Sequence, residues 1–394
     1  MPNTIAYLLP SPDFFSDGQG GAVSHAIGVA NGLASNGDHV WLFAESGVAR
    51  YHNEFHENVE IVEVRCENKG FASEIRFVKQ IVNRLLNKVR HEGCPVAVLM
   101  RKTFWSLPYI GVLQRSIGDD AVIVAEVNGL SYNMSSPLLE KTRLNRLLVL
   151  INKRFLRLAD TVYCVSASLQ NELTNGVLKI ASNAVEVIPN GGPPPCHLPQ
   201  GVEYIPGSST DSVRFVYFGK FQPYNNFEAV FDAFERHRSD GYSSELAFVG
   251  FGKEEEFIKR RASATNCCHV YGPMSLRSTI RKGIITKNTY GLIPLYNNIV
   301  AEYLSPIKLY DYFSAGCPVV YSDVGCLKEM VGAGGFGKMY APDKAASLAM
   351  TMNECCEEFE CLPDYRRKVQ AAYEGHTWER RMADLRTAIK ENTT

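Results

Sequence analysis

The chain has 394 residues, a length that predicts two domains, or three, at about 100–200 residues per domain. Apolar residues make up 45% and charged residues 21% of the chain, which excludes a disordered protein because enough apolar surface is present to form cores. The 41 Lys and Arg nearly balance the 42 Asp and Glu, so there is no global positive field for nucleic acid, and any phosphate site must be local.

The 11 cysteines form neither a CxxC series nor a small disulfide framework, and the N-terminus does not read as a signal peptide. We therefore expect free thiols in a reducing compartment, the cytoplasm. No apolar run reaches the roughly 18–20 residues that span a bilayer. The sequence predicts a soluble or peripheral protein.

The N-terminal half alternates short apolar runs with segments of helical periodicity. It opens with a strand at Ile5–Leu9, a glycine-rich loop at Ser16–Gly21 and a helix that ends at Gly37. Because short apolar strands alternate with helices, we expect a parallel sheet covered on both faces. Further strands are expected at 40–44, 59–64, 96–100, 122–127, 161–165 and 185–188, with helices at 75–90 and 144–159.

From Pro189 to Ser212 the composition shifts to Pro, Gly and Ser, which is typical of a linker. The alternation then restarts, so we expect a second α/β domain. Strands are expected at 214–219, 246–250, 269–271, 290–295 and 319–322, helices at 227–238, 254–265 and 307–315, and a helical tail after Ala341.

Two doubly wound domains bind ligands beyond the carboxyl ends of their strands, and we expect the domains to face each other across a cleft that holds the site. The loops that follow the strands are where chemistry is expected. They span residues 18–21, 219–226, 250–253 and 297–306.

Gly20 and Gly21 directly precede the first helix, where free backbone amides and the helix dipole favour an anion. The loop lacks the lysine of a P-loop and the G-x-G-x-x-G spacing, so a plain tight turn is the alternative. Gly252, in the partial G-x-G at residues 250–252, lets a ligand approach the backbone. The glutamates at 254–256 argue against a nicotinamide-cofactor site there.

The most informative stretch is SPIKLYDYFSAGCPVV, residues 305–320. Pro306 suits the first position of a helix, and Lys308 and Asp311 then share one helix face. A lysine there can meet phosphate oxygens, and an aspartate one turn later can accept hydrogen bonds from sugar hydroxyls. An exposed salt bridge is the alternative.

This stretch resembles the donor-site motif of the retaining, GT-B-fold glycosyltransferases of family four, in the variant S-P-x-K-L-x-E-Y-x-A-x-G-x-P-V. The resemblance extends to GGAVSHAIGVANGLASNGDHV near the N-terminus, VIPNG before the linker, FVYFGKFQPYNN at the start of the second domain, FVGFGKEEE after its second strand, and His376-Thr377-Trp378. The order and spacing of these motifs agree over nearly the whole chain.

The resemblance implies the GT-B fold: two Rossmann-like domains, an acceptor-binding one at residues 1–193 and a nucleotide-sugar-binding one at residues 207–374. The tail, residues 375–394, would pack back on the first domain. The implied activity is the transfer of a hexose-type sugar, with retained configuration, from a UDP- or GDP-sugar to a glycan or lipid-linked acceptor. No D-x-D pair follows a strand, which agrees with catalysis without metal, and no cofactor is expected.

Carried over residue by residue, the resemblance assigns two sets of positions. Lys220 takes the slot of the family's arginine, and Asn128 lies where members place a residue beside the donor sugar. The catalytic positions are Lys220, Lys308 and Glu302. The substrate-binding positions are Gly20, Gly21, Asn128, Gly219, Gly252, Tyr303, Ser305, Pro306, Leu309 and Asp311.

The chain departs from the family pattern at several of these positions. The family's second lysine falls near Asn225, and the first of its paired glutamates falls on Tyr303, with Glu302 one position further. Lys220 lacks the two-pronged geometry of arginine, and Asp311 is one methylene shorter than glutamate. We expect Lys308 to replace the missing positive charge.

Three alternatives remain open: a nucleotide-sugar epimerase of the same fold, a non-catalytic nucleotide-sugar-binding relative, and, as the weakest, a nicotinamide-dependent dehydrogenase. The segment at residues 141–157 carries six basic residues and no acidic one. Such a helix can rest on the inner membrane face, where lipid-linked acceptors occur. A helix packed on the core with a solvated basic face explains the same pattern.

Overall fold

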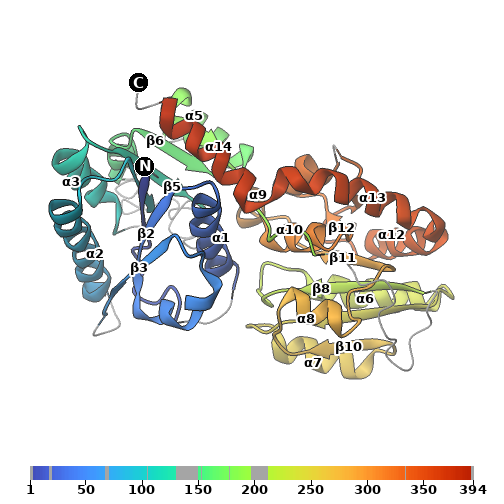
Figure 1. Ribbon diagram of the computed structural model, residues 1–394. Coiled ribbons are helices and arrows are strands. Elements are labelled where there is room, and N and C mark those ends of the chain that lie inside the picture. The colour runs from blue at the N-terminus through green and yellow to red at the C-terminus, as the bar shows by residue number, and fades with distance from the viewer. Residues whose placement is uncertain are drawn as a thin grey trace. The chain divides into compact units, whose positions relative to one another are not determined.

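The computed structural model describes residues 3–16, 20–66, 71–103, 105–129, 150–151, 153–176, 178–196, 212–332 and 334–391. Parts of three expected features lie outside the described residues: 17–19 of the glycine-rich loop, 141–149 and 152 of the basic segment, and 197–211 of the linker. The chain forms two compact units (Figure 1). Unit 1 comprises Met1–Gly191, Tyr303–Ser305 and Trp378–Thr394, and unit 2 comprises Gly192–Glu302 and Pro306–Thr377.

Unit 1 is built on seven parallel strands: β1 (Thr4–Leu8), β2 (His39–Glu45), β3 (Val59–Val64), β4 (Ala97–Arg101), β5 (Val122–Val127), β6 (Thr161–Cys164) and β7 (Val185–Val187). Their order in the sheet is β3-β2-β1-β4-β5-β6-β7. All six residues of β5 are buried, because helices cover both faces of a parallel sheet. The one charged residue among these six is Glu126.

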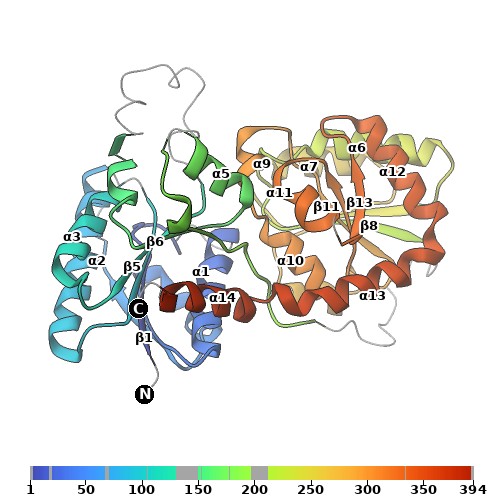
Figure 2. The ribbon, with the colours of Figure 1, turned by 90° about the horizontal axis from the view of Figure 1, so that it is seen from above.

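The helices of unit 1 include α1 (Gly21–Ser35), α2 (Phe71–Glu92), α3 (Leu107–Ile117), α5 (Ala167–Asn175) and α14 (Trp378–Glu391). The last of these, α14, lies beside α1 in both ribbon views (Figures 1 and 2). Gly28 and Gly32 of α1 allow this close packing, because a side chain at Gly28 would collide with the indole of Trp378. An ion pair of 2.8 Å between Arg386 and the buried Asp38 also holds α14.

Unit 2 has six parallel strands: β8 (Val213–Phe218), β9 (Ser244–Val249), β10 (Cys268–Tyr271), β11 (Thr289–Ile293), β12 (Val319–Ser322) and β13 (Gly337–Tyr340). Their order, β10-β9-β8-β11-β12-β13, is that of a doubly wound sheet. Successive residues of β8 serve opposite cores: Phe215 and Tyr217 pack on one face of the sheet, and Val216 packs on the other.

The helices of unit 2 are α6 (Phe227–Ser239), α7 (Glu255–Ala264), α8 (Leu276–Arg281), α9 (Ile299–Tyr303), α10 (Ile307–Ser314), α11 (Gly325–Leu327), α12 (Ala345–Glu357) and α13 (Leu362–Tyr373). Buried apolar residues of α6, α7 and α12 belong to the core on one face of the sheet, and those of α8 and α10 to the core on the other, while α13 contributes Leu362 to the first core and Val369 and Tyr373 to the second. The N-cap of α6 is Asn226, whose side chain accepts a hydrogen bond from the amide of Ala229 at 3.0 Å.

The predicted fold class is confirmed, since each unit is a parallel sheet between helices. One local expectation is wrong: the loop expected at 297–306 contains α9, whose start is fixed by the Asn298 side chain, which accepts hydrogen bonds from the amides of Val300 and Ala301. The sequence pattern also missed α3, α5, α8 and β13.

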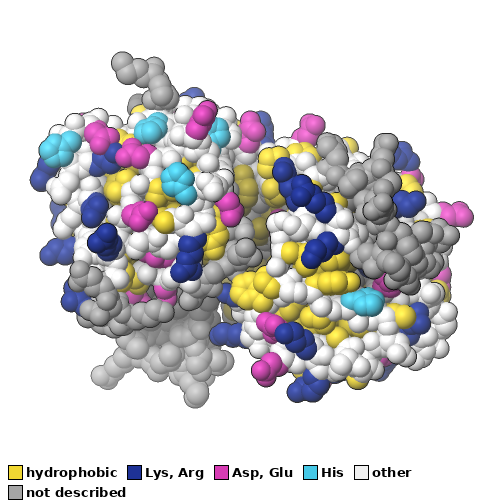
Figure 3. Space-filling view, turned by 60° about the horizontal axis from the view of Figure 1, so that its bottom comes forward, with side chains coloured by type: hydrophobic (Ala, Val, Ile, Leu, Met, Phe, Trp, Pro, Cys, Tyr) yellow, Lys and Arg dark blue, Asp and Glu magenta, His cyan; other side chains and the backbone are white. Residues whose placement is uncertain are grey.

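Side chains of both charge signs are scattered over the face of the molecule shown in Figure 3. This distribution agrees with the nearly balanced composition and leaves charge to act locally. Within the described ranges, no helix combines the length and the hydropathy that a membrane crossing needs.

Candidate functional site

The loops that follow β8 and β9 pack against each other through their backbones. The amide of Gly219 donates to the carbonyl of Val249 at 2.9 Å, and that of Phe221 donates to the carbonyl of Phe251 at 2.7 Å. Gly250 and Gly252 have φ of 151° and 148°, and a Cβ on either would collide with the backbone of the β8 loop, at Gly219 or Phe221. Only glycine permits this approach, which fixes the backbone on both sides of Lys220.

Lys220 is a half-buried cation at this edge of the unit 2 sheet. Its ammonium lies 5.7 Å from the ring centroid of Phe251, and its carbonyl accepts a hydrogen bond from Tyr217 Oη at 2.8 Å. The tyrosine comes from β8 and is fully buried. A rigid strand therefore holds the backbone of Lys220, while its ammonium stays within reach of a ligand.

A second cation reaches the same edge from α10. Lys308 Nζ donates to Tyr217 Oη at 2.5 Å and to Asn225 Oδ1 at 3.1 Å. It also lies 4.0 Å from the centre of the tyrosine ring. A Cβ on Gly219 would be 3.8 Å from Lys308 Cε. The ammonium of Lys308 is thus held at Asn225, the position where the family pattern has its second lysine.

Asp311 lies one turn after Lys308 on the same face of α10. Burial shifts the pKa of both side chains. Burial lowers the pKa of Lys308 to about 7, although the negative charge of Asp311 opposes this shift. Burial likewise raises the pKa of Asp311 to about 7, opposed by the charge of Lys308. Because the loss of water outweighs their mutual attraction, each group is ready to gain from a polar or charged ligand.

The other predicted residues of the 302–309 stretch lie in different environments. Glu302 is exposed near the end of α9. Tyr303 packs against the core of unit 1, and its carbonyl accepts a hydrogen bond from Ser166 Oγ at 3.2 Å. Pro306 is the buried N-cap of α10. Leu309 is 0% exposed, and its side chain packs in the core of unit 2.

Ser305 is buried and engaged within unit 1. Its Oγ accepts a hydrogen bond from the amide of Asn190 at 3.1 Å, and its carbonyl accepts one from the Asn190 side chain. The chain crosses from unit 1 to unit 2 directly after this residue. Ser305 therefore anchors the segment that leads into α10.

Gly20 and Gly21 form the start of α1 in unit 1. Gly20 is the N-cap, in extended backbone and without a side-chain cap. The first amides of a helix lack intrahelical partners, and Gly21 is exposed. The backbone donors at this end of α1 are the groups through which the sequence predicts that an anion binds.

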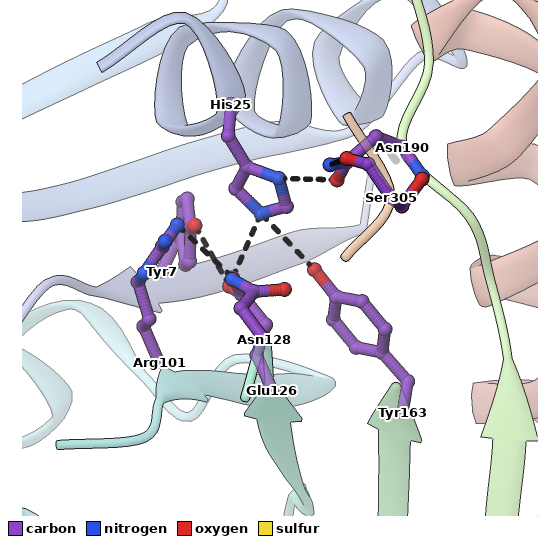
Figure 4. A network of polar contacts seen from close by, with 8 residues as sticks. All are labelled: Tyr7, His25, Arg101, Glu126, Asn128, Tyr163, Asn190 and Ser305. Atoms are coloured by element: carbon purple, nitrogen blue, oxygen red, sulfur yellow. Dashed lines mark hydrogen bonds and ion pairs between the residues drawn. The ribbon is translucent and has the colours of Figure 1, made fainter. Parts of the chain in front are cut away.

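A buried polar network lies at the carboxyl edge of the unit 1 sheet, centred on Glu126 of β5 (Figure 4). Its Oε2 accepts a hydrogen bond from Tyr7 Oη at 2.8 Å. Its Oε1 lies 2.7 Å from His25 Nε2 and 3.2 Å from Arg101 Nη1, and it accepts a hydrogen bond from Asn128 Nδ2. Glu126 is completely buried, so all of its partners come from the protein.

His25 connects this network to the anchor of Ser305. Its Nδ1 lies 2.7 Å from Asn190 Oδ1, and its ring meets Trp378 of α14 edge-on, with 5.1 Å between ring centroids. Both ring nitrogens of His25 therefore lie beside oxygen atoms, Nδ1 beside Asn190 Oδ1 and Nε2 beside the Glu126 carboxylate.

The charges of the network keep Glu126 ionised. Burial alone would raise the pKa of its carboxyl group, but the charges of His25 and Arg101 and the hydrogen bonds from His25 and Tyr7 lower it to about 2. Next to Arg101, burial lowers the pKa of Lys102 to about 8. In the part of the chain that the structure describes, no three His, Cys, Asp or Glu side chains cluster as a metal site.

The sequence analysis did not single out Glu126, Arg101 or Tyr7. A signal for them exists in the sequence: each is a polar residue at or just before the end of an otherwise apolar strand. Since the carboxyl ends of β1, β4 and β5 meet at one edge, polar residues at those ends converge.

Comparison with known families decides the classification. Residues 19–192 match the family described as Glycosyltransferase Family 4, and residues 212–358 match the Glycosyl transferases group 1. The chain belongs to the family 4 glycosyltransferases. This family 4 chain is therefore an enzyme that transfers a sugar from a nucleotide-sugar donor.

Solved structures share the GT-B fold of this glycosyltransferase over nearly its full length. Sucrose-phosphate synthase from Thermosynechococcus elongatus has a TM-score of 0.71 and 14% identity, covering 99% of this chain and 98% of that one. HepE from Anabaena, in complex with UDP and glucose, has a TM-score of 0.65 and 15% identity, covering 98% of this chain and 100% of that one. The lipopolysaccharide outer core galactosyltransferase WaaB, in its apo form, has a TM-score of 0.63 and 15% identity, covering 98% of this chain and 99% of that one. No match was found among curated proteins.

Proposed function

We propose that this glycosyltransferase moves a hexose from a UDP- or GDP-sugar to a glycan or lipid-linked acceptor, with retention of configuration and without a metal ion or cofactor. The nucleotide diphosphate would bind to the unit 2 domain, and the acceptor to the N-terminal domain. The observation that carries the proposal is the position of Lys308, whose ammonium is held 3.1 Å from Asn225 Oδ1 at the loop edge of β8.

The reaction requires positive charge because the departing diphosphate gains negative charge in the transition state. Lys220 and Lys308 would provide it from the β8 loop and from the first turn of α10. A diphosphate beside Lys308 favours its protonated form, which burial disfavours in the free protein. Two lysines fixed before the ligand arrives would stabilise the charge without reorganisation.

Asp311 would accept hydrogen bonds from the ribose hydroxyls, since it lies one turn beyond Lys308 on α10. From unit 1, the amides of Gly20 and Gly21 would donate to the diphosphate, and Asn128 would contact the donor sugar. Glu302, exposed near the end of α9, is the carboxylate proposed to act at the sugar.

The identity of the donor base is supported by one relative. HepE was solved with UDP and with UDP-glucose, which favours a uridine diphosphate donor here. The basic segment at residues 141–157 supports peripheral contact with the cytoplasmic face of a membrane, where lipid-linked acceptors of surface-polysaccharide assembly occur.

A thermal-shift screen with UDP, GDP, ADP and their sugars tests the proposal, because a ligand that binds only the folded state raises its apparent stability. We expect UDP or GDP, together with one of its sugars, to raise Tm. NMR of the product should then show the donor's anomeric configuration, and EDTA should leave the rate unchanged. Inversion of configuration or a rate abolished by EDTA contradicts the proposed mechanism, and no shift with any nucleotide contradicts donor binding.

A further inference from the structure

The charge of Glu126 determines which way the Asn128 side chain points. An ionised carboxylate only accepts hydrogen bonds, whereas a carboxamide has one donating and one accepting end. In the structure, Asn128 turns its Nδ2 toward Glu126 Oε1 (Figure 4). The reverse orientation would place two acceptor oxygens against each other. Glu126 thus fixes the orientation of the Asn128 carboxamide.

As a result, the carboxamide oxygen of Asn128 faces away from Glu126. This Oδ1 atom is buried and has no hydrogen-bond partner among the residues that the structure describes. A buried acceptor without a partner has lost its hydrogen bond to water, so a ligand that offers a hydroxyl group there restores one.

Asn128 lies at the edge of the sheet where ligands bind in folds of this kind. It follows β5 directly, and doubly wound sheets bind ligands beyond the carboxyl ends of their strands. The start of α1, with Gly20 and Gly21, belongs to the loop after β1 at the same edge. The natural hydroxyl donor at such an edge in a glycosyltransferase is a sugar.

We infer that Glu126 is a positioning residue, which holds the Asn128 carboxamide so that Oδ1 accepts a hydrogen bond from a hydroxyl group of the donor sugar. Glu126 does not touch the sugar itself. His25, Arg101 and Tyr7 keep the carboxylate in place from α1, β4 and β1. The inference rests on the proposed function, because it needs a nucleotide-sugar donor.

An exchange of the two functional groups tests this role. Glu126→Gln removes the shared counter-charge of His25 and Arg101, and Asn128→Asp places two carboxylates in contact. The double variant Glu126→Gln/Asn128→Asp keeps the total charge, lets the new amide donate to the new carboxylate, and still presents an oxygen acceptor to the sugar. Asp160→Ala is the matched control, because it removes a hydrogen bond to the same strand, β5, at the amide of Ile123 and touches no member of the Glu126 network.

Each variant is measured for hydrolysis of a nucleotide sugar without acceptor, for its affinity for UDP and GDP by calorimetry, and for Tm. The probe is whichever of UDP-glucose, UDP-galactose, UDP-N-acetylglucosamine and GDP-mannose the wild type hydrolyses fastest. We expect each single variant to lose at least about tenfold in kcat/KM, and the double variant to return to within about threefold of wild type. Nucleotide affinity should stay unchanged, and Asp160→Ala should lower Tm with little effect on hydrolysis.

Three outcomes separate the possibilities. Wild-type rates in folded Asn128→Asp protein overturn the inference, and so does a double variant that folds and binds nucleotide but hydrolyses no faster than the slower single variant. If Glu126→Gln does not fold, the comparison of Asn128→Asp with the double variant decides. A wild-type protein that neither binds nor hydrolyses any of the probes refutes the proposed function instead.

Discussion

Lys308 shows how its surroundings change the chemistry of one side chain. It contacts a phenol and a carboxamide, and burial lowers its pKa to about 7. Asp311, one turn away, has its pKa raised to about 7 by the same loss of water. The protonation of each group affects ligand binding in a definite direction.

Donor affinity should therefore pass through a maximum near pH 7. Above this pH the free protein has a neutral Lys308, which must take up a proton to bind diphosphate, so affinity falls by up to about tenfold per pH unit. Below it Asp311 is protonated and is a poorer acceptor for ribose hydroxyls, so affinity falls again. Calorimetric titration of the nucleotide sugar from about pH 5.5 to 9 measures both limbs.

Substitution of Lys308 separates the two limbs. Lys308→Arg should remove the alkaline decline, because a guanidinium stays charged throughout this range. Lys308→Ala should weaken kcat/KM at least about tenfold at pH 7, which corresponds to about 1.4 kcal/mol. An alkaline decline that persists in Lys308→Arg shows that another group titrates.

At the scale of elements, two strand-end loops form one rigid support for Lys220. The β9 loop touches the β8 loop through Gly250 and Gly252, whose positive φ angles and lack of Cβ both matter. This support holds the backbone beside Lys220 at the end of the sheet, where we propose that the diphosphate binds.

Gly250→Ala should displace the β8 loop, because the new Cβ would collide with the carbonyl oxygen of Gly219. We expect a loss of stability of about 1–3 kcal/mol from overpacking and at least about tenfold weaker donor binding. Gly241→Ala is the matched control, since Gly241 also has a positive φ of 94° but open space around it. Chemical denaturation and calorimetry report the two effects. Equal donor affinity in both variants contradicts a positioning role for this contact.

At the scale of the whole molecule, the last helix completes the first unit. α14 packs on α1 through Gly28 and Gly32, and Arg386 is the ion-pair partner of the buried Asp38. Trp378 also contacts the ring of His25 in the polar network. The end of the chain is therefore part of the core of unit 1, although unit 2 separates the two in sequence.

Truncation after Thr377 should destabilise unit 1 selectively. It removes the buried Trp378, Met382 and Leu385, each contributing about 1.5–3 kcal/mol, against a total domain stability of about 5–15 kcal/mol. It also leaves Asp38 buried without its cation. Calorimetry should show that the unfolding transition of unit 1 moves to a lower temperature or disappears. The transition of unit 2 should still move to a higher temperature when the nucleotide is added. A truncated protein with unchanged transitions contradicts this account.

The fold class and the family could both be predicted from the sequence alone. β5 and β12 have the bounds that their apolar runs predicted, because strands buried on both faces of a parallel sheet carry a strong local pattern. The motif around Lys308 was readable for a similar reason: Pro306 and the spacing of Lys308 and Asp311 are local features of one helix start.

The surroundings of each functional group could not be predicted before the folded chain was seen. The approach of Lys308 to Asn225 joins residues 83 positions apart, and the bond of Tyr7 to Glu126 joins residues 119 positions apart. Leu309 faces the core of unit 2 and Ser305 is held by Asn190, which the motif could not show. Contacts between distant residues depend on how strands and helices assemble. The burial of a side chain, its charge state and the orientation of its polar groups follow from that assembly and not from local sequence.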